Sequence, residues 1–146
     1  MTDISDTFFT SIGCMDGRIQ SAVASFGKTR FGAKYPDTIT EAGMVGILSH
    51  KPSKAILNGV KNKILISVKH HHSKGIVVHG HEQCAGNPVS DDQQIKDIIE
   101  AARVLKELEP GVDIVPVFIA RKNNTWKIQE LESASFKKTA HVLNLY

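Results

Sequence analysis

The chain has only two cysteines, and each belongs to a short polar motif that follows an apolar run. Cys14 begins the motif CMDGR, and Cys84 ends the motif HEQC, which begins at His81. The turn between His81 and Cys84 lets an imidazole and a thiolate bind one ion. A third ligand from Cys14 would give Zn2+ two thiolates and one imidazole, with the fourth tetrahedral position exchangeable. That is the composition of a catalytic zinc site.

Asp16 and Arg18 place a carboxylate and a guanidinium beside the first cysteine. Alternate residues of an extended segment point the same way, so Cys14, Asp16 and Arg18 are expected to line one side of a crevice. Two uses of Asp16 remain open. Held by Arg18 in a bidentate pair, it stays ionised and accepts a hydrogen bond from zinc-bound hydroxide. Released from Arg18, it occupies the fourth metal position and closes the site.

The other histidines of this region allow a structural and a functional interpretation. His79 is either a packed or solvent-facing histidine at a strand end, which we favour, or a group that supports the metal ligands or carries protons. His70, His71 and His72 end a predicted helix, where cations interact favourably with the helix dipole. Metal recruitment or proton relay is the alternative for these three residues.

Three acidic or aromatic residues carry weaker expectations. Glu41 and Glu82 could line the pocket, but solvation is the favoured state for both. Trp126, together with Phe118 and Ile128, is predicted to pack the C-terminal hairpin against the helix after Ser90.

Short apolar runs alternate with segments of helical periodicity. The predicted strands cover residues 8–12, 38–40, 75–78 and 112–119, and a last strand returns through Trp126, Ile128 and Leu131. A turn is predicted at Lys34–Asp37 and another near Lys122–Asn124. Pro116 indicates an edge or irregular pairing of its strand, or a position where no ladder donor is needed.

Helical spacing of apolar residues appears three times, from Ile19 to Phe26, from Ile56 to Val68 and from Ile95 to Leu108. Ser53 is the predicted N-cap of the second helix, which should run into the histidine triplet. Ser90 and Gln93 form a capping box before the third helix.

This order of elements predicts an α/β fold, with a mostly parallel central sheet, helices on both faces and an antiparallel C-terminal edge hairpin. In such sheets the working residues gather beyond the carboxyl ends of the strands. Cys14 follows the first strand and Cys84 the third, so the two motifs are expected to meet in one crevice.

Size and composition favour one domain, 1–146, since 146 residues with 41% hydrophobic content can build one core. The 18 lysines and arginines against 15 acidic residues form no basic run, so no nucleic-acid partner is expected. No apolar segment is long enough for a bilayer, and the N-terminus lacks a charged leader. We therefore expect no membrane contact and a cytoplasmic location, where thiolate chemistry is favoured over a disulfide.

Together the motifs CMDGR and HEQC, each after an apolar strand, resemble those of the beta class of carbonic anhydrases. The resemblance extends from Phe8 to about Leu131 and includes Ala42-Gly43 and the strand at residues 74–78. The chain looks like a short, divergent member. Thr40-Glu41 replaces the family's Arg-Asn, and Ala85 stands where a glycine usually follows the second cysteine.

The resemblance implies that Cys14, His81 and Cys84 hold zinc, and that Asp16 and Arg18 form the dyad that orients zinc-bound hydroxide. It implies a lyase that reversibly hydrates carbon dioxide to bicarbonate, acting as a homodimer or higher homo-oligomer. Two alternatives share the same ligands. One is a zinc hydrolase acting on carbonyl sulfide or carbon disulfide, and the other is a catalytically silent zinc-binding protein.

Overall fold

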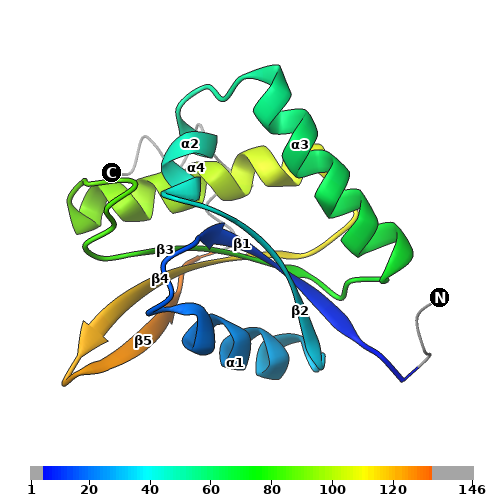
Figure 1. The fold of residues 1–146 in the computed structure, drawn as a ribbon, viewed down its shortest axis with the longest axis horizontal. Coiled ribbons are helices and arrows are strands. Elements are labelled where there is room, and N and C mark those ends of the chain that lie inside the picture. Colours follow the sequence, from blue (N-terminus) through cyan, green and yellow to red (C-terminus); the bar gives the residue numbers. More distant parts are fainter. Residues whose placement is uncertain (1–4, 133–146) are drawn as a thin grey trace.

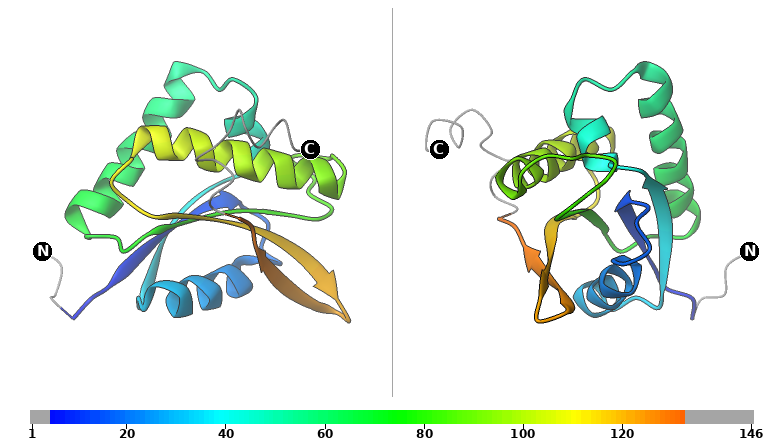
Figure 2. Two further views of the ribbon diagram at one scale, coloured as in Figure 1. Left: turned by 180° about the vertical axis from the view of Figure 1, so that it is seen from behind. Right: turned by 60° about the vertical axis from the view of Figure 1, so that its left-hand side comes forward.

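The computed structural model describes residues 5–132 and has three layers (Figure 1). A five-stranded sheet, in the order β2-β1-β3-β4-β5, forms the middle layer. Helix α1 covers one face, and α2, α3 and α4 cover the other (Figures 1 and 2). The strands are β1 (Phe8–Cys14), β2 (Tyr35–Glu41), β3 (Ile76–His81), β4 (Ile114–Lys122) and β5 (Thr125–Glu130). The helices are α1 (Gln20–Phe31), α2 (Met44–Ser49), α3 (Lys54–Leu65) and α4 (Asp91–Leu108), and a π-helical segment, η1 (Ile66–His70), continues α3.

The sheet topology confirms the predicted fold class. Strands β1 to β4 run parallel, and β5 pairs antiparallel with β4. Gly13 of β1 lies opposite His79 of β3. The carboxyl ends of β1 and β3, which carry Cys14 and His81, are therefore neighbours.

The central strand β3 is buried at every position, as expected for a parallel strand with helices on both faces. Two apolar clusters result, one beneath α2, α3 and α4, and the other between the sheet and α1. Serine N-caps begin two of the helices: Ser53 accepts the Ile56 N–H and Ser90 accepts the Gln93 N–H. Both caps were predicted from the sequence.

One prediction around β2 is wrong. Lys34–Asp37 was predicted as a turn, but β2 already begins at Tyr35, which pairs with Phe8. Pro36 is tolerated because β2 is an edge strand, where one side of the ladder needs no donor.

Helix α2 was not predicted, because Gly43 and Gly46 suggested a loop. Gly46 instead allows close packing, since a Cβ there would lie 2.6 Å from the Asn87 side chain.

Strand β4 is internal, so the edge position that Pro116 suggested is wrong. The ladder with β5 begins at Val117, and the Pro116 carbonyl accepts the Leu131 N–H. The other interpretation therefore fits, because Pro116 lies where no ladder donor is needed.

Trp126 packs on the α1 side of the sheet, not against α4 as predicted. Ile128 lies opposite Ile119, and both belong to the cluster beneath α1. Phe118 faces the other way and joins the cluster beneath α4, because adjacent residues of a strand point to opposite faces.

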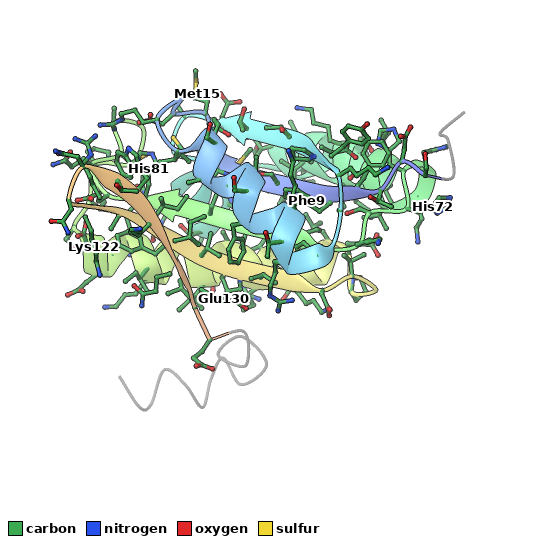
Figure 3. The ribbon with its side chains drawn as sticks, turned by 90° about the horizontal axis from the view of Figure 1, so that it is seen from below. Phe9, Met15, His72, His81, Lys122 and Glu130 are labelled. Carbon is green, nitrogen blue, oxygen red and sulfur yellow. The ribbon has the colours of Figure 1, made fainter. Side chains whose placement is uncertain are left out.

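The helix after Ser53 reaches the histidine triplet, as predicted, through η1. Within η1, the buried Ser67 hydroxyl donates to Asp37 Oδ2 at 2.7 Å and lies 2.7 Å from Thr10 Oγ1. His71 Nδ1 lies 2.7 Å from the same Asp37 oxygen, and the His71 ring stacks on Phe8. His72 lies at the opposite end of the molecule from His81 (Figure 3).

No helix among residues 5–132 is both long and apolar enough to cross a membrane. The predicted domain, 1–146, includes residues 1–4 and 133–146, which lie outside the described residues.

Candidate metal centre

The structure brings Cys14, His81 and Cys84 together at the carboxyl edge of the sheet. Their ligand atoms all lie within 4.8 Å of one another, and all three side chains are buried. Cys14 ends β1, His81 ends β3, and Cys84 follows in the loop before α4. In the part of the chain that the structure describes, this is the one cluster of histidine, cysteine and acidic residues with such geometry.

His81 has the orientation of a metal-binding imidazole. Its Nδ1 lies 2.7 Å from the Glu82 carbonyl oxygen, to which the Nδ1–H donates. The proton on Nδ1 leaves a lone pair on Nε2. That atom is buried and has no hydrogen-bond partner of ordinary geometry among the described residues. A backbone carbonyl that fixes the tautomer in this way is the usual support of a metal-bound histidine.

The two sulfur atoms lie 3.7 Å apart. Two thiolates at about 2.3 Å from a tetrahedral zinc ion would be separated by about 3.8 Å. The spacing of the sulfur atoms, the free Nε2 lone pair and the soft donor set therefore all fit Zn2+.

Cys14 is prepared to be a thiolate. Burial raises the pKa of this thiol, but contact with His81 and the Gly43 N–H outweighs burial and brings the pKa down to about 7. The Gly43 N–H donates to Cys14 Sγ at 3.5 Å. Burial and the neighbouring Cys14 sulfur raise the pKa of Cys84. Cys14 is thus the easier of the two thiols to deprotonate in the metal-free protein.

Asp16 and Arg18 lie in the loop between β1 and α1 and form the predicted bidentate pair. Arg18 Nη2 donates to Asp16 Oδ2 at 2.7 Å, and Nε donates at 3.1 Å to both carboxylate oxygens. The guanidinium of Arg18 lowers the pKa of Asp16 to about 2. Asp16 Oδ2 also lies 3.8 Å from His81 Nε2. The carboxylate therefore stands ionised at the border of the ligand cluster while Arg18 holds it.

His79 is fully buried beside Gly13, and its Nε2 lies 3.2 Å from the Ser11 hydroxyl. Burial, with a smaller contribution from His81, lowers the pKa of His79 to about 3. A neutral imidazole without solvent contact matches the packed interpretation better than the solvent-facing one.

The two glutamates suggested as pocket residues lie on different sides of the site. The Glu82 carboxylate accepts the Arg121 N–H and so joins the loop that carries the candidate ligands His81 and Cys84 to β4. Glu41 lines a cavity of about 350 Å3 between β2, α2 and α3, with Ala42, Met44, Ile56 and Lys63 among the other lining residues.

Sequence reasoning missed two residues that border the site. Gln20 donates through Nε2 to the Cys14 and Asp16 carbonyl oxygens and so shapes the loop, and no sequence signal indicates it. Trp126 lies beside His81 and Arg18. The place of Trp126 could have been inferred from the sequence. A two-residue turn at Asn123-Asn124 places Trp126 opposite Arg121, on the same face of the sheet as His81.

Comparisons with known proteins agree with this architecture. The family model described as "Putative carbonic anhydrase" matches residues 4–132, and the chain belongs to this family. A comparison with curated proteins finds no match.

Three solved structures share the fold. Beta-carbonic anhydrase isoform I from Trichomonas vaginalis is 18% identical over 88% of this chain and 85% of its own, with a TM-score of 0.54. The beta-carbonic anhydrase CafA of Aspergillus fumigatus is 15% identical over 96% of this chain and 83% of its own, with a TM-score of 0.53. Carbonic anhydrase from Streptococcus mutans is 16% identical over 90% and 87%, with a TM-score of 0.55. The fold is that of beta-class carbonic anhydrases.

Proposed function

We propose that the protein is a zinc-dependent enzyme that reversibly hydrates carbon dioxide to bicarbonate. One observation carries the proposal. An ionised carboxylate, Asp16, stands at the border of a buried Cys-His-Cys cluster and is held there by Arg18 instead of lying within the cluster.

Cys14, His81 and Cys84 would hold the ion. When bound, zinc supplies a Lewis acid that lowers the pKa of a water molecule at an open position. Two thiolates weaken this effect by neutralising the charge of the ion, so the surrounding residues matter more.

Asp16 provides an acceptor at the border of the site. Because Arg18 uses two nitrogens to hold the carboxylate, one orientation is strongly favoured, and Asp16 can accept a hydrogen bond from a donor at the open position. Arg18 also compensates the negative charge of Asp16 beside two thiolates. This arrangement supports an open site over the catalytically silent form, in which Asp16 would occupy the fourth position.

The test measures zinc content and stopped-flow hydration on the same preparations of wild type and Asp16→Asn. The variant keeps the shape of the side chain and loses its charge. We expect zinc to remain stoichiometric while kcat/KM falls by about 10- to 100-fold, the usual effect of removing a group that supports a metal site. Asp92→Asn, an exposed residue of α4, is the matched control and should retain full activity.

Zinc-loaded wild type without hydration between about pH 6 and pH 9, which brackets the pKa of about 7 that zinc gives to water in such sites, would contradict the proposal. Activity on carbonyl sulfide or carbon disulfide alone would replace it with the hydrolase.

We also propose a homodimer. Strand β2 is an unpaired edge within the described chain, and Glu41, which lines the cavity beside it, pairs with Cys14 in the sheet. A second copy covering this edge would shelter both features.

A further inference from the structure

Trp126 is the only tryptophan of the chain and lies near the start of β5. The residues of the preceding turn, Asn123 and Asn124, both have positive φ, which is typical of a tight two-residue hairpin. The hairpin places Trp126 opposite Arg121 of β4. Lys122, which ends β4, lies at the same end of the molecule as His81 (Figure 3).

The indole ring contacts three residues of the site and its border. Arg18 Cζ lies 5.2 Å from the ring centroid and Arg121 Cζ lies 4.6 Å from it. The His81 ring meets the indole edge-on, with centroids 6.3 Å apart and an interplanar angle of 85°. A partly buried tryptophan with two guanidinium groups against it does more than fill the apolar cluster beneath α1.

Arg18 needs such support. Its side chain is 43% exposed, and an exposed arginine has many accessible rotamers. Apart from its contacts with Asp16, the Arg18 side chain makes one long hydrogen bond within residues 5–132, from Nη2 to the Gln83 carbonyl oxygen at 3.4 Å. The Asp16 carboxylate is anchored to its own loop, because the Arg18 backbone N–H donates to Asp16 Oδ1 at 2.9 Å. The Arg18 guanidinium is therefore the mobile part of the pair and the part that a further contact would hold.

The hairpin that carries Trp126 is itself tied to the metal-binding loop. The Arg121 N–H donates to the carboxylate of Glu82, the residue after His81. The position of the indole ring is therefore set relative to His81 by β3, β4 and this contact.

We propose that Trp126 is a positioning residue. Its ring holds the Arg18 guanidinium by a cation–π contact, and Arg18 in turn holds Asp16 beside the metal ligands and away from the fourth metal position. The inference rests on the proposed roles of Arg18 and Asp16.

The test compares Trp126→Leu, which removes the aromatic ring, with Trp126→Phe, which keeps one. The first measurement is the NMR signal of the Arg18 Nε–H group in protein without added metal. We expect a ring-current shift in wild type, a smaller one in Trp126→Phe and its loss in Trp126→Leu. The matched control is Phe31→Leu, because Arg30 lies 5.6 Å over Phe31 outside the site. This control should leave the Arg18 signal unchanged.

The second measurement is azide binding to cobalt-substituted protein, followed by visible absorption. Trp126→Leu should weaken azide binding about two- to fivefold, the equivalent of one exposed cation–π contact, because the freed Asp16 competes for the metal. Trp126→Phe should keep most of the wild-type azide affinity. In an Asp16→Asn background, Trp126→Leu should have no further effect.

An unchanged Arg18 signal in Trp126→Leu would overturn the proposal, and so would an equal loss of azide affinity in the Asp16→Asn background.

If Trp126→Leu fails to fold, Arg18→Gln tests the same contact. It should increase acrylamide quenching of Trp126 fluorescence while Arg30→Gln does not, and equal quenching would overturn the proposal. The Arg18 signal is independent of hydration, so an inactive wild type with a shifted signal would refute the proposed function and leave the positioning role intact.

Discussion

Gly43 and Gly32 share a backbone φ of +62° but have different surroundings. The Gly43 N–H donates to Cys14 Sγ, and a Cβ on Gly43 would collide with the Gly86 carbonyl group. A Cβ on Gly32 would meet nothing within 4 Å. A glycine is thus needed at position 32 only because of the positive φ. At position 43 it is also needed for the close approach of the two loops that carry the cysteines.

Gly32→Ala should lose about 1–2 kcal/mol of folding free energy, since alanine is disfavoured in the left-handed region. Gly43→Ala should lose more, because its Cβ would also collide with the Gly86 carbonyl group. Only Gly43→Ala should also lower zinc affinity, by about tenfold, because it displaces the loop that carries Cys84. Urea unfolding and competition with a chromophoric chelator measure the two effects. Equal zinc affinity in both variants would contradict this role of Gly43.

The cluster of candidate metal ligands could be predicted because the chemical types of these residues and their places after strands define it. Cys14, His81 and Cys84 needed only parallel β1 and β3 to meet. Trp126 depends on more, because the hairpin register decides which side of the sheet its ring covers. The contact of Gly43 with Cys14 depends on α2, which the sequence did not indicate.

At the scale of elements, η1 and the start of β1 are joined by buried side chains. Ser67, 2% exposed, bridges Asp37 of β2 and Thr10 of β1. These hydrogen bonds anchor the end of α3, whose outer face is largely exposed. A π-helical turn there rotates Ser67 toward the sheet.

Ser67→Ala should cost about 1–3 kcal/mol of unfolding free energy, because it leaves buried polar partners without their hydrogen bond. Ser49→Ala is the control, since the Ser49 hydroxyl donates only to a carbonyl of its own helix and is partly buried. Zinc content should not change, because this network lies at the opposite end of β1. Zinc loss in Ser67→Ala would show that the two ends of the sheet are coupled.

Elements with a continuous apolar run or a regular apolar spacing were predictable, whereas the short helix α2 was not. Helix α4 has a cap and apolar residues at regular spacing, and β3 is a continuous apolar run. Helix α2 has six residues and two glycines at its start, so its helicity comes from packing against α4 and Asn87. Such tertiary packing leaves no periodic signal in so short a segment.

For the whole molecule, His79 should dominate the loss of stability in weak acid. Its pKa falls from an ordinary 6.5 to about 3 on folding, because the charged form is buried. Between these values the unfolded chain binds a proton that the folded protein does not, so stability falls as the pH falls. Asp16, with a pKa lowered from 3.8 to about 2, contributes stability that is lost only below about pH 4.

Between pH 6.5 and pH 5, metal-free wild type should therefore lose about 2 kcal/mol more unfolding free energy than His79→Gln. The pKa of His81 is raised by Cys14 and the Glu82 carbonyl despite burial, and its opposite effect on stability is the same in both proteins. Urea unfolding at both pH values provides the measurement. His70→Gln, at an exposed position, should behave as wild type. The same pH dependence in His79→Gln would assign the effect to another group.

The two sulfur ligands lie 70 positions apart in the chain, with β2, β3, α1, α2 and α3 between them. An ion bound by both would be a cross-link that closes a long loop, and loop closure reduces the entropy of the unfolded chain. The centre proposed for chemistry would thus also hold the first half of the sheet together. Metal supply would set the lifetime of the folded protein as well as its reactivity.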